Sequence, residues 1–219
     1  MWYALFYLFV FGIADGILRY ALSWSIGTYP NKSRWFLLHA FGNACTLYAI
    51  SPEILTALAH PESIYVIPTT FEGLWCVGAL HIYHTLAFPL NGDEIFHHIM
   101  FVLFMGSYCL IFQPYIASSV PLITINGLPG IIDYTLLALV KLKQVSKLTE
   151  KRVNAWLNVW IRMPITLFLA GIGYTGIVAQ SRWECIPCLI MVSYNAIYYG
   201  NMAIVNHQEY RHQQQKMKG

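Results

Sequence analysis

Four histidines lie close together in the stretch from residue 80 to residue 98, on either side of a turn-forming segment at 89–93. His81 and His84 are three residues apart, and His97 and His98 are adjacent. Residues three apart share a helix face, so His81 and His84 are expected to project together. A neutral imidazole can act as a general base, act as a nucleophile or bind a metal ion. This stretch is therefore the first candidate for chemistry.

Other polar side chains lie within segments that are otherwise apolar. Ionisable residues inside a membrane cost about 2.5–3.5 kcal/mol each on insertion scales, so they usually face the interior of a bundle. We expect Asp133 and Arg162 to form a buried ion pair. Asn158 lies four residues before Arg162 and shares its helix face, and Asn126 lies seven residues before Asp133. His39 adds a further imidazole near the start of its own segment.

The composition indicates an integral membrane protein. Of the 219 residues, 57% are hydrophobic and only 11% are charged, and the mean hydropathy is +0.51. A soluble domain of this size carries roughly 25% charged residues, so a soluble globular protein is excluded. The formal net charge of +3 is too small to indicate a nucleic-acid partner.

The segments that position these residues are expected to be membrane-spanning helices. A span needs about 20 apolar residues, and about seven segments qualify. They are residues 2–27, 35–57, 71–90, 94–113, 120–141, 152–178 and 185–206. The sequence therefore predicts an all-α polytopic membrane protein. Residues 1–31 form an N-terminal transmembrane helix, residues 32–206 a domain of six helices, and residues 207–219 a polar C-terminal tail.

The basic residues predict the orientation. With seven spans, one side of the membrane carries the segments at 28–34, 91–93 and 142–151 and the C-terminal tail. Ten Lys and Arg residues lie in these segments or at the span ends beside them. The opposite side keeps only Arg182. Positive residues gather on the cytoplasmic side, so we expect the N-terminus outside and the C-terminus in the cytoplasm. The expected location is the endoplasmic reticulum or another endomembrane, with an organelle inner membrane as the alternative.

The cysteines do not form a disulfide framework. The five are scattered, and only Cys185 and Cys188 form a C-x-x-C pair. That pair is either incidental or a disulfide or redox pair, and its spacing alone leaves both readings open.

Three segments resemble the TLC domain, a membrane fold shared by TRAM proteins and ceramide synthases. The segment Ser33-Arg34-Trp35-Phe36-Leu37-Leu38-His39-Ala40 resembles the opening of that domain, and the pair His97-His98 resembles its paired histidines. The stretch from Lys151 to Pro164 resembles its late Asn…Arg…Pro span. The resemblance covers roughly residues 32–206 and suggests a divergent member. The ceramide-synthase motif ends in a His-Asp…Asp group, whereas here no His directly precedes Asp133 and no second Asp follows it.

The resemblance implies a helical bundle around a central cavity that holds an acyl lipid. Ceramide synthases transfer an acyl group from acyl-CoA to an amine, and their paired histidines are central to that reaction. Acyl-CoA is thus the expected co-substrate, and a lipid acyltransferase is the expected enzyme class. The expected catalytic residues are His97, His98 and Asp133. The expected substrate-binding residues are His39, His81, His84, Asn126, Asn158 and Arg162.

Other functions fit the same residues. A non-catalytic lipid-binding or trafficking protein would use the same cavity, and a structural subunit of a larger membrane complex would be recognised through its spans. The expected partners are the bilayer, a bound acyl lipid and, in the last case, other membrane proteins. The histidines also permit a zinc site, although the sequence alone assigns no residue as a metal ligand.

Overall fold

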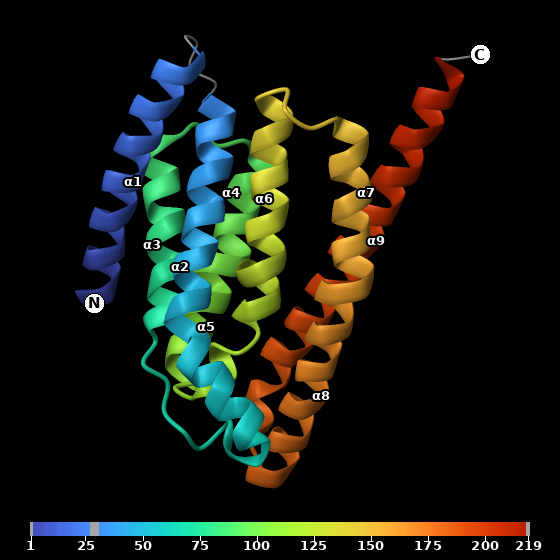
Figure 1. The fold of residues 1–219 in the computed structure, drawn as a ribbon. Helices are drawn as coiled ribbons and strands as arrows, with labels where there is room; N and C mark the ends of the chain where they lie inside the picture. Colours follow the sequence, from blue (N-terminus) through green and yellow to red (C-terminus); the bar gives the residue numbers. More distant parts are fainter. Residues whose placement is uncertain (1, 27–30, 218–219) are drawn as a thin grey trace.

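The computed structural model of the chain describes residues 2–26 and 31–217, and in this part of the chain all regular elements are helices (Figure 1). Helix α2 (Asn31–Ala59) packs against α1 (Trp2–Ile26), α3 (Glu72–Ala87) and α6 (Leu128–Lys141). The long helices lie side by side and alternate in direction along the chain. One face of α2 therefore contacts three helices, while Tyr48 and Leu55 on its other face are exposed.

Wide, π-helical turns interrupt or precede several helices. Helix α4 continues through the π-helical segment η2 into α5, α7 continues through η5 into α8, and η4 leads into α6. Their bounds are Gly92–His97 for α4, His98–Met105 for η2, Gly106–Phe112 for α5, Ile123–Gly127 for η4, Lys147–Leu157 for α7, Asn158–Arg162 for η5 and Met163–Gln180 for α8. Short 3-10 turns are η1 (Pro61–Ser63), η3 (Ile116–Ser118) and η6 (Trp183–Cys185), and α9 spans Ile186–Lys216.

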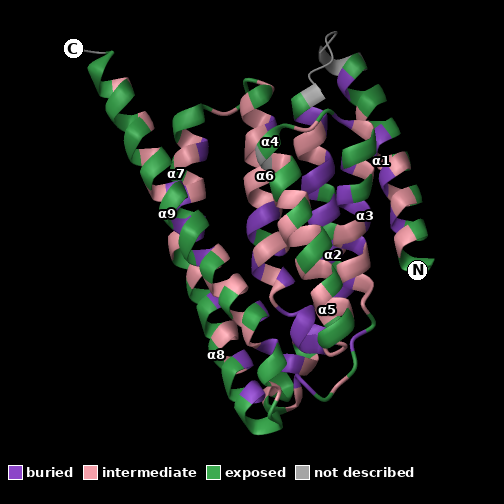
Figure 2. Cartoon of the chain, turned by 180° about the vertical axis from the view of Figure 1, so that it is seen from behind, coloured by how far each residue is buried: buried purple, intermediate pink, exposed green. Residues whose placement is uncertain are grey.

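Five helical segments are long and apolar enough to cross a membrane. They are Trp2–Ser23, Glu94–Phe112, Ile116–Lys141, Lys147–Gln180 and Trp183–Lys216. The expected all-helical architecture with several apolar helices is confirmed at this level, whereas α2 and α3 do not meet the same measure. Helix α3 has only 16 residues, and α2 carries buried polar side chains. Figure 2 shows buried positions on both helices, where they contact neighbouring helices. The count of seven spans stays a prediction.

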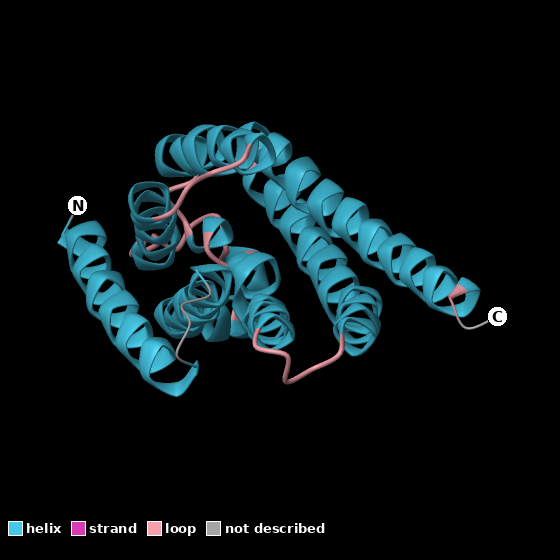
Figure 3. Ribbon diagram, turned by 90° about the horizontal axis from the view of Figure 1, so that it is seen from above, coloured by secondary structure: helices cyan, strands magenta, loops and turns pink. Residues whose placement is uncertain are grey.

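The two ends of the bundle differ in which connections they carry. The α3–α4 turn, the α6–α7 connection and the C-terminal end of α9 lie at one end, and the described N-terminal end of α1 lies toward the other (Figure 1). The orientation of the chain in the membrane remains a prediction. Seen from above, α1 and the end of α9 lie at opposite sides, with α9 projecting outward (Figure 3).

Helix α9 continues as one helix to Lys216, so residues 207–216 extend the last helix. No break in α9 marks the expected boundary at residue 206, and the three-part division of the chain stays a prediction.

Glycine allows a close approach between α2 and α3. A Cβ atom built on Gly73 would lie 2.2 Å from Cγ2 of Ile50, a side chain that is fully buried. A Cβ on Gly78, in the same helix, meets no atom within 4 Å. Small residues at such contacts are a common way for membrane helices to pack closely.

Replacing Gly73 with alanine is therefore expected to lower the free energy of unfolding by about 1–3 kcal/mol, the usual cost of overpacking. Replacing Gly78 with alanine should leave stability unchanged or raise it by up to about 1 kcal/mol, because alanine favours the helix. Unfolding by titration with a denaturing detergent measures both variants. Equal stability of the two variants would contradict the packing assigned to α2 and α3.

Candidate histidine site and apolar pocket

Five histidines converge from three consecutive parts of the fold. His39 comes from α2, His81 and His84 come from α3, and His97 and His98 lie where α4 meets η2. The ring centroids of His39 and His84 are 4.9 Å apart, those of His84 and His98 are 5.0 Å apart, and those of His81 and His97 are 5.5 Å apart. The structure thus brings together all five imidazoles that the sequence placed in the candidate site.

Local hydrogen bonds fix where α4 begins and hence where its histidines lie. The side chain of Asn91 accepts a hydrogen bond of 2.9 Å from the backbone N–H of Glu94. The carboxylate of Glu94 in turn accepts one of 2.8 Å from the backbone N–H of Asn91. This reciprocal capping satisfies two N–H groups at the helix start. The next helical turn then carries His97 and His98 toward α3.

Two of the imidazoles have one ring nitrogen engaged at the edge of the cluster. Nδ1 of His39 lies 2.8 Å from the backbone carbonyl of Trp35, and since a carbonyl only accepts, this nitrogen carries the hydrogen. The Thr85 hydroxyl donates to the backbone carbonyl of His81 at 2.7 Å and lies 3.0 Å from Nδ1 of His98. Because that hydroxyl hydrogen is already used, Nδ1 of His98 donates. Nε2 of each ring therefore keeps its lone pair.

His81 and His98 make the one direct nitrogen–nitrogen hydrogen bond found between the five rings. Nδ1 of His81 lies 3.1 Å from Nε2 of His98, whose lone pair accepts the hydrogen. The contact joins α3 to η2 across the hairpin. His81 also lines the apolar pocket that begins beside this cluster.

His84 is the most enclosed member of the cluster. Its side chain is 2% exposed, and both of its ring nitrogens are buried without a hydrogen-bond partner in the described part of the chain. The ring of Trp35 packs edge-on against it with centroids 5.1 Å apart. A buried polar group without a partner costs about 1–3 kcal/mol. Packing alone therefore does not account for a histidine at this position.

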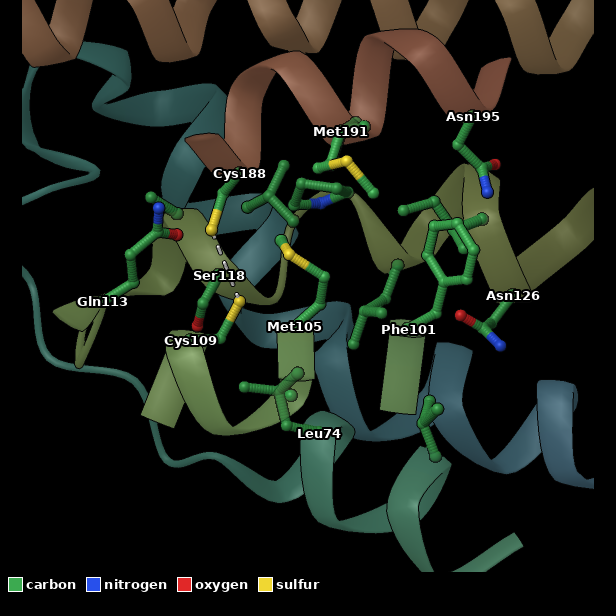
Figure 4. Close-up of a pocket in the computed structure, with 18 of the residues that line it drawn as sticks. Leu74, Phe101, Met105, Cys109, Gln113, Ser118, Asn126, Cys188, Met191 and Asn195 are labelled. Carbon is green, nitrogen blue, oxygen red and sulfur yellow. Dashed lines mark hydrogen bonds between the residues drawn. The ribbon is translucent and has the colours of Figure 1, made fainter. Parts of the chain in front are cut away.

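A large apolar pocket adjoins the histidines. Its volume is about 940 Å³, and it is lined by side chains from α2, α3, η2, α5, η4, α8 and α9. His81, His97 and His98 belong to its wall, and most of the rest is Leu, Ile, Val, Phe and Met. Figure 4 shows part of the wall, with Phe101 and Met105 directed into the space between helices. Pockets of about 300–1,000 Å³ with few polar groups are typical of small-molecule sites.

A few uncharged polar residues complete this wall. Asn126, which the sequence assigned to substrate binding, and Asn195 lie toward one end of the view, and Gln113 lies toward the other (Figure 4). The sequence patterns did not single out Gln113 and Asn195. Each is an amide side chain in an otherwise apolar segment, and this could have identified them because an amide costs free energy when it is placed against lipid.

The C-x-x-C pair is not bonded, because Cys185 and Cys188 are both free thiols. Sγ of Cys188 instead lies 3.9 Å from Sγ of Cys109 on α5, and both of these residues line the pocket (Figure 4). Cys188 thus lies beside a cysteine of another helix, a contact that spacing in the sequence does not reveal.

Asp133, Asn158 and Arg162 form a separate polar chain, outside the wall of the pocket. The Asn154 side chain donates to Oδ1 of Asp133 at 2.6 Å. Asn158 donates to Oδ1 of Asn154 at 2.6 Å and accepts from Arg162 at 3.1 Å. Within the described residues, the expected direct ion pair between Asp133 and Arg162 is therefore absent, because two asparagines bridge them and Arg162 also donates to the carbonyl of Thr124.

Removing the central asparagine of this chain should be costly. Asn158 is 4% exposed, so replacing it with alanine removes the bridge between two partly buried partners, Asn154 and Arg162. The expected loss is about 1–3 kcal/mol in the free energy of unfolding. Asn201→Ala, at an exposed position of α9, is the matched control and should stay within about 0.5 kcal/mol of the parent protein. Detergent-induced unfolding followed by tryptophan fluorescence measures both.

The three π-helical segments coincide with candidate site residues. Segment η2 begins at His98, η4 contains Asn126, and η5 contains both Asn158 and Arg162. Single wide turns inside α-helices occur frequently at functional sites. The catalytic and substrate-binding roles expected for these residues and for Asp133 stay predictions.

Aromatic residues around the cluster were not assigned a role from the sequence. Trp35 packs against His39 with ring centroids 4.4 Å apart, and Tyr134 of α6 packs against the same histidine at 5.0 Å. Tyr134 adjoins Asp133 in the sequence, so α6 presents its tyrosine to the histidines and its aspartate to Asn154.

Comparison with models of protein families, with curated proteins and with solved structures found no match. The resemblance to the TLC domain therefore depends on the quoted residues alone, and the geometry of the site carries the functional conclusion.

Proposed function

We propose that the chain is a membrane-embedded acyltransferase that draws an acyl chain into the apolar pocket and uses His97 as general base. In this proposal the bundle is TLC-like, with seven spans, and the pocket is its central cavity. The observation that carries the proposal is the placement of three imidazoles, His81, His97 and His98, in the wall of a pocket of about 940 Å³ that is otherwise mostly apolar.

The pocket favours a flexible apolar ligand. Each CH₂ group that leaves water gains about 0.8 kcal/mol, so a long chain binds through its length and needs few polar contacts. The amides of Asn126, Gln113 and Asn195 offer isolated polar contacts along the wall. A lipid chain with a reactive group at the histidine end fits this distribution.

Among the two paired histidines, His97 is better placed to accept a proton. Both ring nitrogens of His98 are engaged, by Thr85 and by His81. No hydrogen bond found in the described part of the chain uses a ring nitrogen of His97, whose ring stacks on Phe101 with centroids 5.2 Å apart. His97 is thus held by packing while its nitrogens remain available to substrate.

The proposed reaction is transfer of an acyl group from a thioester. His97 accepts the proton of an N–H or O–H group on the acceptor while that nitrogen or oxygen attacks the thioester carbonyl. The C–S bond then breaks, and the leaving thiolate takes the proton back from the imidazolium. Lys141, Lys143 and Lys147 lie in and beside the α6–α7 connection, at the end of the bundle that also carries the α3–α4 turn, and supply positive charge for the phosphates of CoA.

Filling the pocket tests the lipid part of this proposal. Gly106 lines the pocket, and a Cβ atom added to it would meet no atom within 4 Å, so phenylalanine there should enter the pocket without forcing helices apart. We expect Gly106→Phe to lower the acyl lipid that co-purifies with the protein by about tenfold, as loss of about 1.4 kcal/mol of binding would. Gly171→Phe, at an exposed site with equally open surroundings outside the pocket wall, should retain it.

Mass spectrometry of extracted lipid measures both variants, and equal retention by both would place the lipid elsewhere. Labelled acyl-CoA offered with lipid amines and alcohols in a reconstituted bilayer then tests catalysis. Retained lipid without turnover would favour the lipid-binding or trafficking alternative over the enzyme.

A further inference from the structure

We infer that His81, His84 and His98 bind one divalent transition-metal ion, with zinc as the best match. Each offers a ring nitrogen, and these three nitrogens lie within 4.8 Å of one another. The site goes beyond the proposed acyl transfer, and it holds whether or not the chain is an acyltransferase.

The spacing of His81 and His98 fits two ligands of one ion. Zinc binds imidazole nitrogen at about 2.0–2.1 Å in tetrahedral geometry, which places neighbouring ligand atoms about 3.3–3.4 Å apart. Nδ1 of His81 and Nε2 of His98 are 3.1 Å apart. A shift of the His81 hydrogen from Nδ1 to Nε2 gives the neutral tautomer that leaves two lone pairs at nearly the separation that the ion requires.

His98 is also held in the tautomer that a ligand needs. Its Nδ1–H donates to the Thr85 hydroxyl at 3.0 Å, while that hydroxyl donates to the backbone carbonyl of His81. Metal-binding histidines almost always donate the hydrogen of their other nitrogen to such a partner, which fixes ring orientation and strengthens the ligand. Thr85 is thus a positioning residue for His98.

The third ligand, His84, supplies an independent observation. It is 2% exposed, and both ring nitrogens are buried with no hydrogen-bond partner in the described structure. Its ring lies edge-on to that of His98, with centroids 5.0 Å apart. An ion between the three rings would engage one of these buried nitrogens, which no neighbouring side chain among the described residues does.

The ligand set indicates the metal and its coordination. Three imidazoles without a thiolate or carboxylate match zinc sites that keep a fourth position for water or substrate, and they do not match the two-His, one-carboxylate set of non-haem iron. His81 and His98 also line the apolar pocket, so the fourth position would face it. His97 is outside this group of three and keeps its nitrogens for other chemistry.

The test uses the full-length protein carrying no polyhistidine tag, purified in detergent, stripped with a chelator and titrated with zinc against a chromophoric competitor. We expect about one tightly bound zinc ion per chain. Thr85→Val should weaken zinc binding by about 10–100-fold, the usual effect of removing the partner of a ligand, whereas Thr85→Ser keeps the hydroxyl and should restore the affinity. Thr85 is exposed, so neither change threatens folding.

Combined His84→Ala and His98→Ala should abolish saturable binding, and His60→Ala, at an exposed site outside the cluster, should leave it unchanged. Absence of saturable zinc binding by the parent protein would overturn the inference. So would equal affinities of the Thr85→Val and Thr85→Ser proteins. The measurement uses no substrate, so it tests the metal site without testing acyl transfer. A His97→Ala protein that has lost acyl transfer but still binds zinc would show that the two can fail independently.

Discussion

Replacing His97 with alanine is expected to lower the rate of acyl transfer by about 10²–10⁴-fold, the usual contribution of a general base. The reason is its position: His97 lines the apolar pocket, and no hydrogen bond found within the described residues uses its ring nitrogens. Single-turnover transfer from labelled acyl-CoA measures the effect. The affinity for acyl-CoA should change little, because the chain binds along the apolar wall.

His60→Ala is the control for this experiment, since His60 is exposed and lies outside the cluster. It should transfer acyl groups at the parent rate. If the His97→Ala protein were equally active, the base would have to be another residue. Full lipid retention together with no activity in either protein would instead leave a lipid-binding protein.

The largest expected loss of stability follows from breaking a buried ion pair between α1 and α2. Nη1 of Arg34 on α2 lies 3.1 Å from Oδ2 of Asp15 on α1, and both side chains are 9% exposed. The Tyr83 hydroxyl donates to the same carboxylate oxygen at 3.0 Å. Arg34→Ala leaves the carboxylate buried without its cation, which costs about 3–5 kcal/mol. Detergent-induced unfolding of the purified protein measures the loss.

Glu184→Ala provides the comparison. Glu184 pairs with Arg182 at 3.4 Å, but the side chains are 39% and 37% exposed, so water screens the interaction. Exposed pairs contribute about 0–1 kcal/mol. Similar losses in Arg34→Ala and Glu184→Ala would show that the Asp15–Arg34 contact does not hold α1 against α2.

The histidine cluster was predictable because local rules determine most of it. The turn at 89–93 separates two helical segments, and the three-residue spacing of His81 and His84 predicts a shared face. Those two features suffice to bring imidazoles from neighbouring helices to one depth. The role of Thr85 was not predictable, because its contact with His98 depends on the register between α3 and η2.

Contacts between distant helices were the part that sequence patterns missed. The polar stripe of Asn158 and Arg162 was visible from its four-residue spacing, and its meeting with Asp133 of α6 was expected, but the order of the contacts along it was not. Asp133 therefore accepts a hydrogen bond from Asn154, where a direct ion pair with Arg162 was expected. The same limit explains why Cys188 lies beside Cys109, on another helix, and is not bonded to Cys185.

Length and apolarity left two of the seven expected spans undecided. Helix α3 has only 16 residues, which is shorter than a span needs. One face of α2 packs against α1, α3 and α6, so buried polar residues such as His39 and Asn43 face protein there, whereas Tyr48 on the other face is exposed. Hydropathy measures suitability for lipid and says little about a helix face that contacts other helices. The span count of seven therefore rests on sequence, while five segments meet the measure of length and apolarity.

Photocrosslinking with an acyl-CoA analogue that carries a diazirine at the end of its chain tests the central claim most directly. The account predicts crosslinks inside the pocket, at residues such as Met105, Cys188 and Met191, and their loss in the Gly106→Phe protein. Crosslinks confined to the exposed outer face of α1, at Phe6 or Phe9, and unaffected by Gly106→Phe would contradict it.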